Sequence, residues 1–389
     1  MKAIRAALAA LAALSLVVLI VALISPAGAA SPSPSGAASS GTASASPSAA
    51  SSPSPTRMPP VLAYYYIWFD PSSWDRAKTD YPILGRYSSD DPKVMRQHIV
   101  WAKAAGITGF IVSWKGTEKL NRRLEELIKI AQDENFKLAI IYQGLDFARK
   151  PLPLSQVSAD LELFANQYAK SPVFHIFEKP MVIWSGTWEF SASDVASVTK
   201  QLRSRILVLG SEKNVKGLDR LGGAVDGDAY YWSSVNPDTF PNYQAKLIGM
   251  GDAVHARHGL WIAPAAVGFD ARGIGGSSVV DRNSGGNLRR QFSAAIASSP
   301  DAVGIISWNE FSENSHLEPS TDRGDQALRV LADILHTTPP VIPNLDSSND
   351  GPISAASGSL AEIGRGAALV GVIVLSLLAL IVTARRRRR

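Results

Sequence analysis

The chain has 389 residues, no cysteine, and 39 basic against 34 acidic residues. The lack of cysteine excludes a disulfide scaffold, a thiolate metal site and a cysteine nucleophile. Five positive charges are the last five residues, 385–389, and without them 34 basic residues balance 34 acidic ones. This balance excludes a basic nucleic-acid-binding domain, so we expect no nucleic-acid partner.

Residues 1–30 have the three parts of a secretory signal peptide. Lys2 and Arg5 form a basic start, residues 6–24 are apolar, and Ala27-Gly28-Ala29 is a small-residue cleavage site. An uncleaved signal anchor is the alternative, because an apolar run of this length nearly spans a bilayer. Residues 31–57 are rich in Ser, Pro and Ala and predict a disordered spacer, since they offer little to bury.

The other end of the chain predicts a membrane anchor. After a flexible linker at 337–363, residues 364–384 are apolar enough and long enough for a transmembrane helix. The arginine tail at 385–389 marks the cytoplasmic side, which predicts a single-pass cell-membrane protein with its folded domain outside. Binding of this tail to anionic lipid or nucleic acid is the alternative.

Residues 58–336 predict the folded domain. Strand-like runs occur at 61–68, 107–114, 137–142, 180–184, 205–210, 226–232, 259–264 and 302–308. Helical patterns lie between most of them, at 91–105, 119–134, 155–169, 193–203, 240–257, 287–298 and 325–335. This alternation predicts an α/β fold, a (β/α)8 TIM barrel.

An open doubly wound sheet is the alternative to the barrel. No Rossmann glycine fingerprint follows the first strand, where Tyr64-Tyr65-Tyr66-Ile67-Trp68 stands. The glycine-rich segment at 273–276 follows no strand-to-helix turn and predicts a loop.

Tryptophans occur at or just after several predicted strand ends. If these ends meet at one rim, the side chains would line an aromatic cleft of the kind that binds a ligand. Packing in the barrel core is the alternative for any one of them. The five residues are Trp68, Trp114, Trp184, Trp232 and Trp308.

The last predicted strand runs directly into acidic residues. Glu310 and Glu313 are three residues apart, which places both on one face of a helical turn. Glycoside hydrolysis needs such a pair, with one carboxyl protonated and the other ionised. Burial and proximity separate the two pKa values. A capping or salt-bridged acidic loop is the alternative interpretation.

Other candidate sites are weaker. His255 and His258 fit a solvated helix face, and Asp226 with Asp228 fits a turn better than a calcium site. The sequence has no Gly-x-Ser-x-Gly nucleophile elbow, which argues against serine hydrolase chemistry. We therefore expect no metal and no cofactor.

These motifs resemble the family-99 glycoside hydrolases, the endo-α-mannosidases and endo-α-mannanases. The resemblance begins with the aromatic segment at 64–71 and continues through 81–92, His98, Trp101-Ala102, Ala105-Gly106-Ile107 and Ser113-Trp114. It ends at Trp308-Asn309-Glu310, Glu313 and Leu317-Glu318. Phe311, Lys115 and Asn314-Ser315 depart from the usual family pattern, which bears on the sugar and linkage more than on the reaction class.

The resemblance implies a (β/α)8 barrel that cleaves α-mannosidic bonds with retention, through a 1,2-anhydro sugar. Glu310 would remove the 2-hydroxyl proton, and Glu313 would protonate the leaving oxygen and later activate water. Around this pair, we expect substrate contacts from Tyr66, Trp68, Trp114, Tyr230, Trp232, Trp308, Asn309 and Glu318.

The favoured hypothesis is a monomeric cell-surface glycoside hydrolase acting on an α-linked polysaccharide or glycan. Residues 31–363 hold 31 basic and 34 acidic residues, a slightly acidic balance that suits a neutral glycan. One alternative is a non-catalytic glycan-binding or polysaccharide-biosynthesis protein on the same barrel. The others are an α-1,3-glucanase-like hydrolase and a membrane-anchored adhesion protein.

Overall fold

The computed structural model describes residues 58–343, and its central element is one parallel sheet. Eight strands follow one another in the order β5-β4-β3-β2-β1-β10-β7-β6. Each overlaps one of the eight predicted strand ranges. The strands are β1 (Val61–Tyr66), β2 (Gly109–Trp114), β3 (Lys137–Gln143), β4 (Met181–Ser185), β5 (Leu207–Leu209), β6 (Gly227–Ala229), β7 (Leu260–Ala266) and β10 (Ala302–Ile306).

The two edge strands of this sheet, β5 and β6, meet at one place. Gly210 and Asp228 form a parallel bridge. In it, the Gly210 N–H donates to the Gly227 carbonyl at 3.0 Å, and the Gly210 carbonyl accepts from the Ala229 N–H at 2.9 Å. The sheet is therefore a nearly closed barrel, as the strand and helix alternation predicts, and not an open doubly wound sheet.

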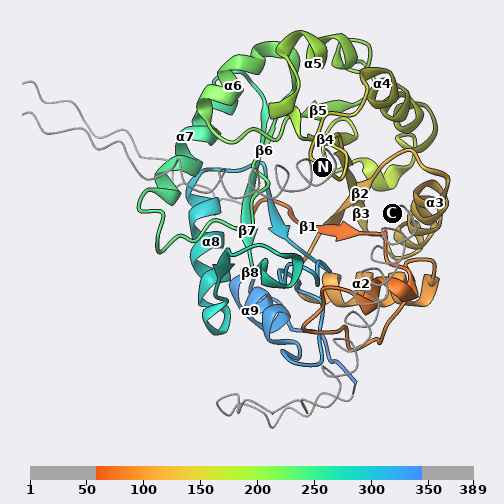
Figure 1. Ribbon diagram of the computed structural model, residues 1–389, viewed down its shortest axis with the longest axis vertical. Coiled ribbons are helices and arrows are strands. Elements are labelled where there is room, and N and C mark those ends of the chain that lie inside the picture. Colours follow the sequence, from red (N-terminus) through yellow and green to blue (C-terminus); the bar gives the residue numbers. More distant parts are fainter. Residues whose placement is uncertain (1–57, 344–389) are drawn as a thin grey trace, which may run out of the picture. The chain divides into compact units, whose positions relative to one another are not determined.

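Helices surround the strands in chain order (Figure 1). The pattern at 155–169 forms a helix that continues through a π-turn (Phe164–Tyr168), and α6 is a helix that the sequence pattern does not predict. The helices are α2 (Pro92–Ala104), α3 (Glu118–Asp133), α4 (Leu154–Leu163), α5 (Ala192–Thr199), α6 (Val215–Leu221), α7 (Tyr243–His255), α8 (Gly286–Ala297) and α9 (Gln326–Ile334).

A short hairpin interrupts the path from β7 to α8. Its strands, β8 (Phe269–Asp270) and β9 (Val279–Val280), pair antiparallel. The glycine-rich segment at 273–276 lies in the connection between them, so it is a loop, as predicted.

Two hydrophobic cores follow from the period-2 alternation of strand side chains. Along β1, Leu62 and Tyr64 belong to a core inside the barrel. Ala63 and Tyr65 belong to a second core between the strands and the helices. The helices complete this outer core with stripes such as Leu124, Leu127 and Ala131 of α3, where the 3.6-residue period of the sequence predicts them.

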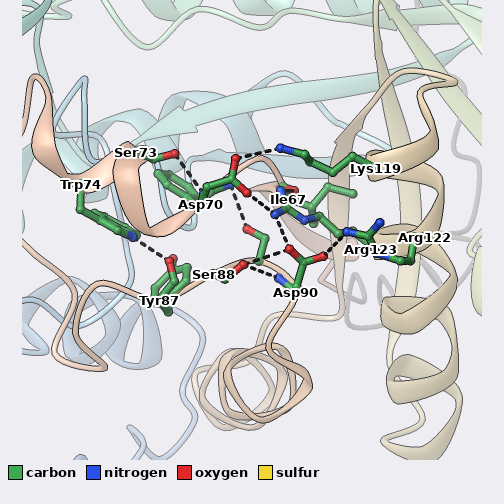
Figure 2. Close-up of polar contacts among 12 residues, drawn as sticks. Ile67, Asp70, Ser73, Trp74, Tyr87, Ser88, Asp90, Lys119, Arg122 and Arg123 are labelled. Carbon is green, nitrogen blue, oxygen red and sulfur yellow. Dashed lines mark hydrogen bonds and ion pairs between the residues drawn. The ribbon is translucent and has the colours of Figure 1, made fainter.

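The long loop after β1 is fastened to α3 by one buried arginine (Figure 2). The Arg123 side chain is fully buried, and its Nη2 lies 2.6 Å from an oxygen of Asp70 and 2.6 Å from one of Asp90. Its Nη1 donates to the Ile67 carbonyl at 3.0 Å. A residue near the start of the loop and one near its end are thus held to the same guanidinium, which fixes the loop between them.

The predictions for the two ends of the chain fall outside the described residues. These are the signal peptide, the spacer, most of the 337–363 linker, the transmembrane helix and the arginine tail. Within residues 58–343, no helix is both long enough and apolar enough to cross a membrane.

Candidate active site

Both predicted catalytic carboxylates lie in the turn that follows β10. The Glu310 N–H donates to Ser307 Oγ at 2.9 Å, which bends the chain directly after the strand. The Glu313 carbonyl accepts from the Asp270 N–H of β8 at 2.7 Å, so the hairpin after β7 holds the far side of the turn. Glu310 is buried and Glu313 is half-buried. The turn therefore presents two acids at the carboxyl end of the barrel, where barrel enzymes hold their reacting groups.

Burial raises the pKa of both carboxyls. The pKa of Glu310 rises to about 7, first because the group is desolvated and second because Glu313 is close. The Ser312 N–H, 3.0 Å from Glu310 Oε1, and the ammonium of Lys78 act in the opposite direction. Burial likewise raises the pKa of Glu313, and Arg149 opposes it. Near neutral pH, a proton is therefore available to this pair, as acid–base chemistry requires.

Two tyrosines face the carboxylates. The hydroxyls of Tyr66 and Tyr231 are hydrogen-bonded to each other. Burial raises the pKa of both, and the negative charges of Glu310 and Glu313 raise it further. Because both phenols stay protonated, they can donate hydrogen bonds to a sugar hydroxyl or to a carboxylate.

Tyr231 is a site residue that the sequence pattern does not single out, since the pattern predicts its neighbour Tyr230. The structure places Tyr230 in the outer core, where its hydroxyl accepts from Lys246 Nζ at 2.7 Å. Tyr231 packs against the inner core instead. Adjacent residues at a strand end point to opposite sides, so a choice one residue away selects the wrong face. The structure therefore does not bring the predicted Tyr230 to the carboxylate turn.

The predicted rim of five tryptophans is also wrong for three of its members. Trp114, Trp184 and Trp308 are fully buried in the outer core. Trp114, for example, donates from Nε1 to Asn121 of α3 at 3.0 Å. These side chains point toward the helices, so neither Trp114 nor Trp308 presents a ring face to a ligand.

The other two tryptophans reach the surface. Trp68 is 40% exposed and stacks on Tyr66, with ring centroids 4.4 Å apart. Since the charges of Glu310 and Glu313 act on Tyr66, Trp68 extends the site outward from these carboxylates. Trp232 is half-buried, and its ring centroid lies 5.6 Å from that of Trp188.

Asn309 and Glu318 are buried supports and do not face a cleft. Asn309 Oδ1 accepts from the Tyr66 N–H at 2.8 Å, and its Nδ2 donates to the Tyr66 carbonyl at 3.0 Å. Glu318 accepts from the Tyr87 hydroxyl at 2.8 Å and lies 3.0 Å from His98 Nε2. The structure thus places the predicted contact residues Asn309 and Glu318 among buried hydrogen bonds, and Asn309 sets Tyr66 beside the turn that carries Glu310.

A second buried network supports the turn from behind. His316 stacks on Phe311, with ring centroids 4.0 Å apart, and its Nε2 lies 3.2 Å from Asp80. Burial, and then the nearby charge of Arg282, lower the pKa of His316 to about 3, so this imidazole is neutral. Arg282 donates to the Asn314 carbonyl at 2.9 Å. The carboxylate turn is thus fixed on both flanks.

The weaker candidates have structural roles. His255 pairs with Asp301 at 3.1 Å. Asp226 and Asp228 accept backbone hydrogen bonds from Val208 and Glu212. Across the part of the chain that the structure describes, no three His, Cys, Asp or Glu side chains are grouped to hold a metal ion.

Comparisons with known proteins indicate the family and the fold of the chain. Residues 70–334 match the model of a family described as Glycosyl hydrolase family 99. The GH99 endo-alpha-mannosidase of Bacteroides thetaiotaomicron is 21% identical, with TM-score 0.62 over 71% of this chain and 96% of its own. A glycoside hydrolase-like protein is 16% identical, with TM-score 0.57 over 72% and 96%. No curated protein matches the chain. The structural likeness shows the fold, and the family match covers more than half of the chain.

Proposed function

The chain belongs to glycosyl hydrolase family 99 and is a glycoside hydrolase, and we propose that it cleaves α-mannosidic bonds in a polysaccharide or glycan. The observation that carries this proposal is the Glu310–Glu313 turn, in which two neighbouring carboxyls have raised pKa values beside two protonated tyrosines. The solved endo-alpha-mannosidase of similar fold supports the choice of mannose.

In the proposed mechanism, Glu310 acts as the base toward the 2-hydroxyl of the sugar and Glu313 as the acid toward the leaving oxygen, with retention through a 1,2-anhydro sugar. The Ser312 N–H and Lys78 favour the ionised form of Glu310. Burial favours the protonated form of Glu313, against the charge of Arg149. Because the pKa of Glu310 is about 7, the rate should rise with pH through this value.

The test of the activity is sugar release by the full chain from α-mannans and, as the competing substrate class, α-1,3-glucans. Glu313→Gln should lower the rate about 10²–10⁴-fold, because the leaving group then departs without a proton donor. Glu189→Gln is a matched control: this exposed glutamate lies on the loop after β4. Equal rates for wild type and Glu313→Gln would refute the assignment, and release from the glucan alone would move the specificity to glucose.

A substrate with a good leaving group separates the two roles. On α-mannosyl fluoride, Glu313→Gln should recover much of the lost rate of the bond-cleaving step, since fluoride needs little protonation, whereas Glu310→Gln should not. The reverse result would exchange the acid and the base.

We also propose that the domain acts outside the cell, held at the membrane by residues 364–384. The apolar character of this segment and the arginines after it support the proposal. Protease added to intact cells should remove the activity, and a chain ending at residue 363 should be released into the medium. Activity that stays protected inside the cell would contradict the proposal.

A further inference from the structure

Arginines without an ion pair gather at one end of the described barrel. Residues 58–343 contain sixteen arginines, and twelve of them pair with a carboxylate. The other four all lie in loops that follow the carboxyl ends of strands, on the side of the carboxylate turn: Arg76, Arg149, Arg282 and Arg323. Elsewhere in residues 58–343 the arginines are paired with carboxylates, so the unpaired ones are confined to the loops at this end of the barrel.

Arg149 is the member of this set that is both exposed and close to the carboxylates. Its charge acts on Glu313 and on Tyr231. Its backbone N–H donates to the Asp146 carbonyl at 3.0 Å, whereas its guanidinium has no hydrogen bond or ion pair within residues 58–343. Arg282, in contrast, is buried and bonded to the turn from behind. The Arg149 guanidinium is thus exposed, close enough for its charge to act on Glu313, and has all its donors available.

The turn that carries Arg149 is held in a defined shape. Leu145 and Pro151 form an antiparallel bridge, and the Asp146 carboxylate accepts from the Lys150 N–H at 2.8 Å. Asp146 therefore caps the turn instead of pairing with Arg149. Lys115 Nζ, at the end of β2, donates to the Leu145 carbonyl at 2.9 Å and adds a second positive charge at the base of the turn.

An aromatic ring accompanies the cation. Phe147, two residues before Arg149, is 107% exposed. A ring and a guanidinium on one turn can hold a sugar by its C–H face and an oxyanion by paired hydrogen bonds, because a guanidinium matches the geometry of carboxylate and phosphate.

We infer that the turn at 145–151 binds a negatively charged substituent of the glycan, such as a phosphate ester or a uronate, through Arg149. The inference rests on the proposed glycosidase function and narrows its substrate class from a neutral glycan to an acidic one. The overall charge of the domain, slightly acidic, does not describe this local surface. Lys115 supports the same charge preference from the base of the turn.

The test compares three α-mannan oligosaccharides of equal length: one neutral, one phosphorylated and one oxidised to a uronate. For the full wild-type chain, kcat/KM should be higher on the acidic substrates, and added salt should reduce this advantage. Arg149→Gln should lower kcat/KM on the preferred acidic substrate ~10- to 100-fold and change the neutral one less than about 3-fold. Whichever acid shows the larger loss identifies the substituent.

Arg86→Gln is the matched control, because Arg86 is exposed in a loop at the same end of the barrel but pairs with Asp75 at 2.9 Å. It should change none of the three rates. An equal loss on neutral and acidic substrates in Arg149→Gln would overturn the inference and make Arg149 a residue that only adjusts Glu313.

Failure of this inference can be told apart from failure of the proposed function. Hydrolysis of the neutral mannan and its loss in Glu313→Gln test the function alone. If no substrate is cleaved, binding of the same three oligosaccharides still decides: the acidic ones should bind more tightly to wild type, and Arg149→Gln should remove the difference. Equal binding would overturn the inference.

Discussion

Two pairs of neighbouring carboxylates lie at the same end of the barrel. The fold lowers the pKa values of one pair and raises those of the other. Hydrogen bonds from Lys119 and Arg123 lower the pKa of Asp70, and the hydrogen bond from Arg123 is the largest cause that lowers the pKa of Asp90. Burial raises the pKa of Glu310 and Glu313. The first pair holds a loop in place, and the second retains a proton for chemistry.

The difference lies in the partner, because the chemical group is the same. A buried guanidinium lies between the two aspartates (Figure 2), whereas no cation bridges the two glutamates: Glu310 accepts from Ser312, and Lys78 and Arg149 act only through their charge. In this protein, the carboxylate pair that shares a cation stays ionised and holds a loop in place. The pair without a shared cation can keep a proton and serve in acid–base chemistry. The following substitutions test this comparison.

The largest effect should come from removing the shared cation. Arg123→Met should lower the free energy of unfolding by about 3–5 kcal/mol, because two carboxylates and the Ile67 carbonyl lose their common partner. Urea denaturation followed by tryptophan fluorescence measures this loss. A loss below about 1 kcal/mol would mean that water replaces the guanidinium at these half-exposed aspartates.

The next effect concerns the pH dependence of stability. The pKa of Glu310 rises from 4.5 to about 7 on folding, so the folded state keeps a proton that the unfolded state has released. Wild type should therefore lose stability as pH rises from 4.5 to 7, by roughly 3 kcal/mol. Glu310→Gln should match wild type at pH 4 and exceed its stability at pH 8.

The aspartate pair has the opposite sign, which serves as an internal control. The lowered pKa values of Asp70 and Asp90 stabilise the folded state at pH values above 3.8, the ordinary pKa of an aspartate. This stabilisation is lost as pH falls below that value. Urea midpoints between pH 2 and 4 report the aspartate pair, and midpoints at pH 4, 6 and 8 report Glu310. A Glu310→Gln variant with the same pH profile as wild type would show that Glu310 titrates normally.

A smaller effect should follow from the cation beside Glu310. Lys78 lowers the pKa of Glu310 from its half-buried position, where its Nζ donates to Ser312 Oγ at 2.6 Å. Lys78→Met should therefore shift the acidic limb of the pH–rate profile upward by roughly one pH unit. Lys93→Met, at an exposed position of α2, is the control. A limb that stays in place would remove Lys78 from the electrostatics of the site.

The smallest effect should come from an exposed partner of the aspartate pair. Arg122 pairs with Asp90 at 2.9 Å, but its side chain is mostly exposed. Arg122→Gln should change the free energy of unfolding by less than about 1 kcal/mol in the urea experiment. A loss as large as that of Arg123→Met would show that burial does not set the strength of this network.

The sequence predicts the barrel and the carboxylate turn because both depend on local patterns. Apolar runs alternate with amphipathic helices, and the last run continues directly into Glu310 and Glu313. The two short strands β5 and β6 fall inside their predicted ranges for the same reason.

Side-chain direction at the strand ends is harder to predict. Trp114, Trp308 and Tyr230 follow the correct strands but point to the helices, because the face of each position depends on a register that the sequence pattern leaves open to one residue. Lys78 and Arg149 were missed for another reason: their loops reach the carboxylates from distant parts of the chain. The sequence does point to the neighbourhood of Tyr231, because this residue directly follows the predicted Tyr230.

The β5–β6 seam gives the barrel one weak side. Each of these strands has only three residues, and one bridge joins them, whereas β2 and β3 pair over six residues. Local opening should therefore cost least at the seam, and its amides should exchange with solvent before those of β2 and β3. Tyr231 lies just beyond β6, and its hydroxyl is bonded to that of Tyr66 on β1, which pairs with β2 over five residues. Local opening between β5 and β6 should therefore move Tyr231 relative to Tyr66. The weakly paired side of the barrel thus lies beside Tyr231, one of the two phenols next to the proposed catalytic pair.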